Sequence, residues 1–403
     1  MKVQPKGLKV GILTSHPIQY QAPWFRALTS LVDLRVYFAF VPDARQQGKG
    51  FNQSFEWDLD LLEGYQSKVL QNRAKIPNSS NYSGCDTPGI VDETEAGEFD
   101  AFIVCGWYLK CYRQAMRACR KLGIPILVRG DSHLETPRSW IKRLALEFRQ
   151  RWLLRQFDGF LSVGEKHTAY LRHYGVAADK ITFSPHFVDN EWFLTHSRID
   201  ASSRVEARKR WKLREEAVIV LFVGKFDSIK RPLDLVKAAR LYLDANSDGL
   251  EGELDLLFVG AGELESEIRS LAASYRVNAV FTGFRNQSEM PIFYAISDLL
   301  ALPSRSETWG LVVNEAMACG TPSIVSNAVG CAPDLIEEGI TGFTYPVGDV
   351  TALSNCLQKM AGKKKNHHDW TPALSRKLET YNVRIAVGGV LQAMDRFTAS
   401  STQ

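Results

Sequence analysis

Long apolar runs, clustered cysteines and an excess of one charge are all missing from this 403-residue sequence. No apolar run approaches the length that spans a bilayer. The start, MKVQPKGLKVGIL, passes into a strand without the layout of a signal peptide. The seven cysteines show neither a disulfide framework nor the spacing of metal ligands. With 49 Lys and Arg against 45 Asp and Glu, the net charge of +4 is too small to indicate a nucleic-acid partner. These absences favour a protein of the reducing cytoplasm.

The composition, 45% apolar and 23% charged, is typical of globular domains, and the length allows two of them. Short apolar runs alternate with helical segments, which predicts an α/β protein with parallel sheets. Strands are expected in the first half at 8–14, 33–40, 101–104, 124–128, 159–163 and 181–184. In the second half they are expected at 217–223, 254–259, 280–283, 299–302 and from 324, and the stretch 339–349 is interpreted as turns.

Residues 304–322, SRSETWGLVVNEAMACGTP, follow a strand and combine a loop with a buried helix. The helix N-terminus presents unpaired N–H groups that suit phosphate oxygens. The amides concerned are those of Gly310, Leu311 and Val312. Glu315, about one turn inside the helix, can accept hydrogen bonds from a ribose diol, and Glu307 in the loop can reach hydroxyls at the other end of a ligand. An acid in so apolar a helix needs a partner.

Two acids separated by seven residues in this setting resemble the E-x7-E motif of retaining glycosyltransferases of family 4. The resemblance implies the GT-B fold, in which two Rossmann-like domains with parallel sheets face a cleft. It implies that Glu307 faces the donor sugar and that Glu315 binds the nucleotide ribose. The loops SHPIQYQ and RGDSHL and the stretch WDLDLLEGY are similar to a bacterial subgroup, so the resemblance extends over nearly the whole chain.

The resemblance also implies a donor site in the second domain. Lys225 and Lys230 occupy the positions of the family's G-R-x-x-x-x-K cations, which hold the donor diphosphate, although Lys225 replaces the usual arginine. Gly260 and Gly262 form a turn near the nucleotide, and the backbone of Phe284 and Arg285 lies where the family positions its base.

In the first domain, loops at the carboxyl ends of strands are expected to carry the remaining site residues. Many family members have a catalytic histidine in the loop after residues 124–128. Here Asp131 stands about at its position and His133 two residues beyond, and the sequence leaves open which of them replaces it. His16 and Gln19, after the first strand, and Trp309 in the second domain are candidates for the acceptor or donor-sugar side. His16 could equally be a turn residue.

Two other stretches carry alternative interpretations. Residues 41–92 are longer than an ordinary connection, which predicts a functional insertion. Within it Asp58-Leu59-Asp60 resembles a metal-binding D-x-D, but exposed acids on a packed segment are the simpler interpretation, and no metal site is expected. Residues 138–155 predict a basic amphipathic helix, which suits either an anionic membrane surface or a solvated domain face.

The sequence therefore predicts an N-terminal acceptor-side domain at 1–190, a linker at 191–215, a nucleotide-sugar domain at 216–375, and a helix at 380–400 that packs back on the first domain. The expected activity is that of a retaining hexosyltransferase without metal or cofactor. It would move a sugar from a UDP- or GDP-linked donor to a hydroxyl acceptor, which could be a sugar, a lipid-linked glycan or a small molecule. Surface polysaccharide, glycolipid or glycoside synthesis, in the cytoplasm or at the inner face of the membrane, would fit. A GT-B homologue that binds nucleotide sugar without turnover, and a GT-B epimerase, are the alternatives.

Overall fold

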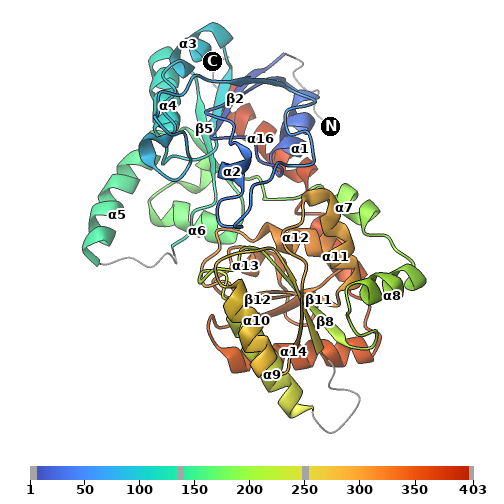
Figure 1. The fold of residues 1–403 in the computed structure, drawn as a ribbon. Coiled ribbons are helices and arrows are strands. Elements are labelled where there is room, and N and C mark those ends of the chain that lie inside the picture. Colours follow the sequence, from blue (N-terminus) through green and yellow to red (C-terminus); the bar gives the residue numbers. More distant parts are fainter. Residues whose placement is uncertain (1–6, 135–139, 247–253, 399–403) are drawn as a thin grey trace. The chain divides into compact units, whose positions relative to one another are not determined.

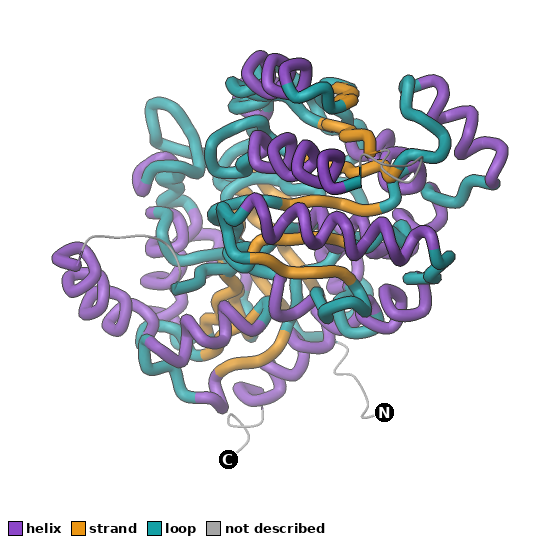
Figure 2. The backbone as a smooth tube through the Cα atoms, turned by 90° about the horizontal axis from the view of Figure 1, so that it is seen from below, coloured by secondary structure: helices purple, strands orange, loops and turns teal. Residues whose placement is uncertain are grey.

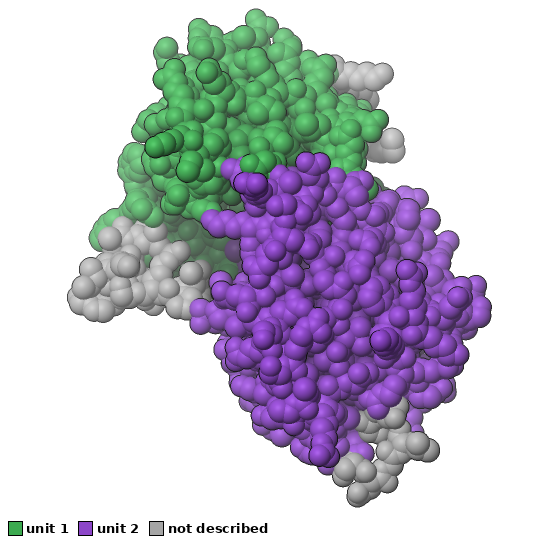
Figure 3. Space-filling view, viewed as in Figure 1, with its two compact units in different colours: residues 1–43, 59–187, 382–403 green, residues 44–58, 188–381 purple. Residues whose placement is uncertain are grey.

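The computed structural model describes residues 7–134, 140–246 and 254–398. The contacts within the chain divide it into two compact units, coloured separately in Figure 3. Unit 1 comprises residues 1–43, 59–187 and 382–403, and unit 2 comprises residues 44–58 and 188–381. The sequence placed residues 44–58 in the first domain, whereas their contacts assign them to unit 2.

Unit 1 is built on a parallel sheet, whose described strands number seven in the order β3-β2-β1-β4-β5-β6-β7. Its strands are β1 (Lys9–Thr14), β2 (Asp33–Phe38), β3 (Gln66–Val69), β4 (Ala101–Val104), β5 (Ile126–Gly130), β6 (Gly159–Ser162) and β7 (Ile181–Phe183). The central strands are buried along almost their whole length because helices cover both faces of the sheet.

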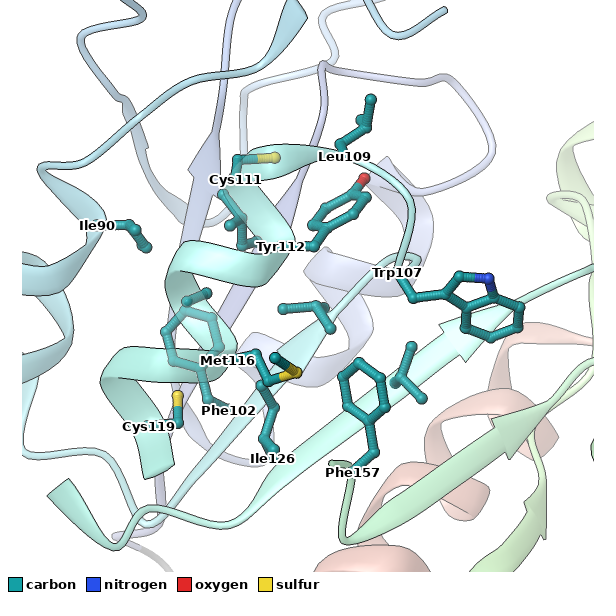
Figure 4. Packing of buried hydrophobic residues seen from close by; sticks show 14 of the residues in the cluster. Ile90, Phe102, Trp107, Leu109, Cys111, Tyr112, Met116, Cys119, Ile126 and Phe157 are labelled. Atoms are coloured by element: carbon teal, nitrogen blue, oxygen red, sulfur yellow. The ribbon is translucent and has the colours of Figure 1, made fainter. Parts of the chain in front are cut away.

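The helices of unit 1 enclose two apolar clusters, one on each face of the sheet. They are α1 (Ala22–Thr29), α3 (Ile90–Gly97), α4 (Lys110–Leu122), α5 (Trp140–Leu154), α6 (Glu165–His173) and α16 (Val383–Thr398), with short 3-10 turns at Tyr82–Gly84 and Ala178–Lys180. Helix α16 returns from the end of the chain to pack against α1, β6 and β7 (Figure 1). Helix α4 supplies much of the other cluster, drawn in Figure 4.

Unit 2 contains a second parallel sheet, with six described strands in the order β10-β9-β8-β11-β12-β13. They are β8 (Val218–Val223), β9 (Leu254–Val259), β10 (Asn278–Phe281), β11 (Leu299–Leu302), β12 (Ser323–Ser326) and β13 (Gly342–Tyr345). Its helices are α2 (Ala44–Gln47), α7 (Asn190–His196), α8 (Ala201–Arg210), α9 (Pro232–Ala245), α10 (Glu265–Ser274), α11 (Met290–Ile296), α12 (Leu311–Ala318), α13 (Ala332–Leu335), α14 (Val350–Lys365) and α15 (Thr371–Leu378), with a 3-10 turn at Gln287–Glu289. Figure 2 shows strands lying between layers of helices, the arrangement expected of Rossmann-like units.

The strand order places a switch point in each sheet. In unit 1, β1 lies between β2 and β4, and in unit 2, β8 lies between β9 and β11. Ligands of open α/β sheets bind outside the carboxyl ends of the strands at such points. The loops that follow β1, β4, β8 and β11 are therefore the places to look for a site.

Two strands were not predicted. β3 lies at the sheet edge and all four of its residues are exposed, so its sequence carries no apolar alternation. β13 falls within the stretch that the sequence analysis interpreted as turns, which was wrong. Its Gly342 is needed because a Cβ there would lie 1.9 Å from the Ser323 carbonyl oxygen on the neighbouring strand.

Candidate functional site

The loop between β11 and α12 carries the E-x7-E motif and ends at Gly310. Gly310 has φ of 101°, and a Cβ there would lie 3.0 Å from Val329 Cγ1 and 3.1 Å from Leu302 Cδ2. Glycine is therefore required both by the left-handed backbone and by close packing. Helix α12 begins directly after it at Leu311. Its first amides have no partner within the helix, as the sequence predicted for an anion site.

Glu307 lies in this loop and pairs with Lys230, which follows β8. The Lys230 ammonium donates to Glu307 Oε2, and the Ser304 hydroxyl lies 3.4 Å from the same oxygen. The side chains of Lys230 and Glu307 are 23% and 18% exposed, so a ligand can still reach them. The structure thus joins the predicted diphosphate cation and the predicted sugar-facing acid, which stand 77 residues apart.

Lys225, the second predicted diphosphate cation, lies among other positive charges. Its ammonium lies 5.2 Å from the centre of the Phe51 ring. Burial lowers the pKa of Lys225; Asp227 opposes this shift, while Lys230 and Lys49 add to it. A partly buried ammonium beside two like charges is stabilised by an anion.

Glu315, inside α12, is buried, with only 4% of its surface exposed. The Tyr294 hydroxyl of α11 donates a hydrogen bond to Glu315 Oε2, and Tyr294 itself is 0% exposed. The sequence required a partner for this acid without indicating which residue supplies it. The contact fixes the carboxylate against α11 within the first two turns of α12.

Gly260 and Gly262 follow β9, and packing of the backbone accounts for both. A Cβ at Gly260 would lie 2.0 Å from the Gly224 carbonyl oxygen, and one at Gly262 would lie 2.5 Å from the backbone of Phe226. The Phe226 amide donates to the Ala261 carbonyl at 3.0 Å. These glycines hold the loop after β9 against the loop that carries Lys225.

Residues 44–58 contribute aromatic side chains to the loop after β10. The Phe55 ring stacks on Phe284 with 4.1 Å between centroids, and Phe51 contacts Phe284 edge-on at 5.1 Å. The Asn286 side chain donates to a backbone carbonyl of the segment at 2.6 Å. Residues 44–58 therefore pack against the loop whose backbone the sequence predicted to position the nucleotide base.

The side chains of Arg285 and Trp309 both contact other residues of unit 2. The Arg285 guanidinium pairs with Glu289 at 2.9 Å and lies over the Trp211 ring at 5.1 Å. Trp309 is only 4% exposed, and its indole N–H donates to Asn314 Oδ1 at 2.8 Å. Most of the Trp309 side chain therefore packs inside unit 2, and its place on the donor-sugar or acceptor side stays a prediction.

In unit 1, the loop after β5 places Asp131 beside a histidine that the sequence analysis did not select. His186 Nε2 lies 3.9 Å from Asp131 Oδ2, and the Arg129 guanidinium donates to the Pro185 carbonyl at 2.9 Å. Burial lowers the pKa of His186, and Arg129 adds to the shift while Asp131 opposes it. His133 is buried, at 6% exposed. Only tertiary structure identifies His186, because it stands more than fifty residues from Asp131 along the chain.

His16 and Gln19 lie in the loop after β1, at the switch point of the unit 1 sheet. The His16 ring lies 2.9 Å from the Ser15 hydroxyl and packs against Phe40, with 5.4 Å between centroids. Burial lowers the pKa of His16 to about 4, so the ring is neutral at neutral pH. A neutral imidazole can accept or donate a hydrogen bond to a ligand hydroxyl.

The D-x-D stretch forms ordinary capping contacts. Asp58 accepts a hydrogen bond from the Ser288 amide at 3.2 Å, and Asp60 accepts from the amides of Leu62 and Glu63. Over residues 7–134, 140–246 and 254–398, no group of three or more His, Cys, Asp or Glu side chains is placed to hold a metal ion.

The predicted basic helix at 138–155 corresponds to α5 (Trp140–Leu154). Arg138 and the side chains of residues 140–146 lie outside what the structure describes. In the remainder, Phe148 and Trp152 are 76% and 59% exposed. No helix in the described part of the chain is both long and apolar enough to cross a membrane.

Comparisons with known proteins agree with this architecture. The chain is 32% identical over 199 residues to a D-inositol 3-phosphate glycosyltransferase of Actinosynnema mirum, covering 48% of this chain and 43% of the relative. The chain spans about half the length of the curated relatives it matches.

Among solved structures, sucrose-phosphate synthase of Thermosynechococcus elongatus superposes with a TM-score of 0.71 at 18% identity, covering 98% of this chain and all of the other. Anabaena Alr3699/HepE, solved in complex with UDP, gives a TM-score of 0.69 at 15% identity, covering 98% and 100%. The two parallel-sheet units have the GT-B fold of these glycosyltransferases. Residues 203–376, most of unit 2, match the family model of glycosyl transferases group 1.

Proposed function

We propose that this protein is a retaining glycosyltransferase that moves a sugar from a nucleotide diphosphate to a hydroxyl acceptor. The observation that carries the proposal is the cluster of Lys49, Lys225 and Lys230, whose charges act on one another beside the switch point of the unit 2 sheet. Lys230 also pairs with Glu307, in the loop that leads into α12. Three ammonium groups and a helix N-terminus form a site for a polyanion. Glu315 lies farther along the same helix, where it would accept hydrogen bonds from the ribose.

The expected mechanism follows from where negative charge develops during sugar transfer. Breaking the anomeric bond builds negative charge on the diphosphate, and groups fixed in place before the reaction lower that barrier. Lys225, Lys230 and the amides of Gly310, Leu311 and Val312 would supply this stabilisation without a metal. Glu307, held by Lys230, would accept a hydrogen bond from a donor-sugar hydroxyl, and binding of the diphosphate would compete with Glu307 for the Lys230 ammonium.

Residues of unit 1 would act at the sugar itself. Asp131 and His133 follow β5, at the edge of the sheet where α/β enzymes carry their ligands. The neighbouring Arg129 and His186 add a cation and an imidazole to the polar groups of this loop. By resemblance to the family, a phosphate oxygen of the donor would help to take the acceptor proton. Attack on the face that the nucleotide leaves gives retention.

The nucleotide part of the proposal has support from known proteins. Anabaena HepE has been solved with UDP and with UDP-glucose, and a sulfoquinovosyl transferase of Arabidopsis thaliana is 27% identical over 291 residues. UDP and GDP sugars remain the candidate donors. The rival functions are a protein that binds nucleotide sugar without turnover and a GT-B epimerase.

A panel of UDP- and GDP-sugars in isothermal titration, followed by hydrolysis assays without acceptor, tests the proposal. We expect one sugar nucleotide to bind, and to be hydrolysed slowly to the nucleotide diphosphate and the free sugar. Binding without hydrolysis would favour the non-catalytic alternative, and conversion to an isomeric sugar would favour the epimerase. Failure of every nucleotide to bind would refute the proposal.

A membrane contact through α5 is a further part of this proposal. Phe148 and Trp152 stand four residues apart, so they share one helix face, and both are largely exposed. Exposed aromatic side chains on a helix with arginines suit an anionic bilayer surface. Co-sedimentation with vesicles containing an anionic lipid should decrease for Phe148→Ser. Equal sedimentation of the variant and the unsubstituted chain would contradict the contact.

A further inference from the structure

A cavity of about 530 Å³ lies in unit 1, beyond the carboxyl ends of β4 and β5. All of its lining residues belong to unit 1. The lining residues that matter here are Tyr82, Trp107, Tyr108, Arg113, Arg149 and Gln150. They come from four places in the sequence: the short 3-10 turn before α3, the loop after β4, helix α4 and helix α5.

The aromatic side chains give the cavity an apolar wall. Tyr82 and Tyr108 are 44% and 52% exposed, and their rings meet edge-on with 6.3 Å between centroids. Trp107 stacks on Tyr170 at 5.8 Å, and Figure 4 shows its indole pointing away from the other labelled side chains of the core. Exposed aromatic faces such as those of Tyr82 and Tyr108 can pack against the C–H faces of sugar rings, while Trp107 is only 9% exposed.

Two arginines give the cavity a positive charge. The Arg113 Nε donates to the Trp107 carbonyl at 2.8 Å, which holds the guanidinium at the wall. Neither Arg113 nor Arg149 forms an ion pair with any residue in the described parts of the chain. Burial lowers the pKa of Arg113, Tyr82 opposes the shift, and Arg149 and Arg117 reinforce it. Two unneutralised guanidinium groups on one cavity are stabilised when an anion lies between them.

Gln150 provides an independent indication of a ligand. Its side chain lines the cavity and is 3% exposed, and its amide nitrogen has no hydrogen-bond partner among the described residues. A buried amide N–H group without an acceptor costs roughly 1–3 kcal/mol. An oxygen of a bound molecule would satisfy it.

We infer that this cavity binds the glycosyl acceptor, and that the acceptor is a sugar that carries a phosphate or a carboxylate. The ring would pack against Tyr82, Tyr108 and Trp107, and the anionic group would lie between Arg113 and Arg149. Its role as acceptor rests on the proposed transferase function, whereas binding of an anionic sugar does not. A neutral sugar would leave both guanidinium groups without a counter-charge.

Isothermal titration of the full chain tests the inference with four probes: glucose 6-phosphate, glucuronate, glucose and inorganic phosphate. We expect one or both anionic sugars to bind more tightly than glucose and more tightly than phosphate alone. The two anionic sugars distinguish a phosphate from a carboxylate as the recognised group. Arg113→Gln and Arg149→Gln should each weaken the favoured sugar roughly ten-fold, the usual effect of losing one charge-assisted hydrogen bond.

Arg117→Gln is the matched control, because Arg117 is exposed one helical turn from Arg113 and does not line the cavity. It should leave sugar binding unchanged. UDP and GDP binding should be the same in all three variants and in the unsubstituted chain, which also shows that the variants are folded.

The inference is overturned if none of the sugars binds at millimolar concentration, if glucose binds as well as the anionic sugars, or if the cavity variants behave like the Arg117→Gln control. If the proposed function is wrong but this inference is right, the outcome differs. The anionic sugar would bind, and Arg113→Gln would weaken its binding, while no nucleotide would bind.

Discussion

Glu315 has two expected roles, and replacing it in two ways separates them. Glu315→Ala removes the acceptor of the buried Tyr294 hydroxyl as well as the proposed ribose ligand. Depriving a buried hydroxyl of this acceptor costs about 1–3 kcal/mol. Glu315→Gln keeps an oxygen for Tyr294 and nearly the same volume, but it removes the charge. We therefore expect the alanine variant to lose stability as well as nucleotide affinity, and the glutamine variant to lose mainly affinity.

The losses of stability and of nucleotide affinity in the two variants can be measured on the same protein samples. Urea unfolding, followed by tryptophan fluorescence, should give a lower midpoint for Glu315→Ala than for Glu315→Gln. A double-mutant cycle with Tyr294→Phe should yield a coupling free energy of about 1–3 kcal/mol. In isothermal titration, Glu315→Gln should weaken binding of UDP or GDP roughly ten-fold, because a charge-assisted hydrogen bond becomes a neutral one.

Two results would refute this reasoning. An unchanged dissociation constant for both nucleotides in Glu315→Gln would remove the ribose role. Coupling near zero between Glu315 and Tyr294 would show that the hydrogen bond between them contributes nothing to stability.

Four other outcomes are expected. An α-linked nucleotide sugar should yield an α-glycoside, and a β product seen in the proton NMR coupling constant would contradict retention. Asp131→Ala and His133→Ala should lower kcat with little effect on nucleotide affinity, and near-native kcat in both would make their loop structural. Burial lowers the pKa of His167 from 6.5 to about 3, so the folded state binds a proton less readily than the unfolded chain. The contribution of His167 to stability should be complete above its ordinary pKa and should decrease as the pH falls, by about 2 kcal/mol near pH 5. Thermal melts of His167→Gln should therefore show a smaller decrease than the unsubstituted chain, while the buried His16 and His186 still contribute to it. Finally, Phe55→Ala, which removes the stack on Phe284, should make residues 44–58 sensitive to limited proteolysis, and an unchanged digestion pattern would count against their attachment to unit 2.

Much of the fold is determined locally by the sequence. Buried parallel strands are near-continuous apolar runs, and this pattern located β1, β4, β9 and β11 to within a residue or two. The buried helix predicted within residues 304–322 is α12, and the flanking Gly310 and Gly320 both have positive φ. Such signals depend only on neighbours along the chain, so they can be recognised before the chain folds.

The strands that were missed lack this local signal. The four exposed residues of β3 have no apolar pattern, and they form a strand only because β2 offers an unpaired edge. Gly342 in β13 was interpreted as part of a turn, although the closeness of β12 is what requires glycine there. In both cases the decisive neighbour lies on another strand.

In the candidate site too, some features are determined by the sequence alone and others only by the folded chain. The sequence by itself determined that a buried acid in an apolar helix must have a partner and that cations follow β8. Only the tertiary structure decided that Tyr294 is that partner, that Lys230 pairs with Glu307, and that Asp131 lies beside His186. Residue type fixes the need for a hydrogen bond or a counter-charge, because desolvation is costly wherever the group is buried. Which residue meets the need depends on how distant segments pack, and no local pattern records that.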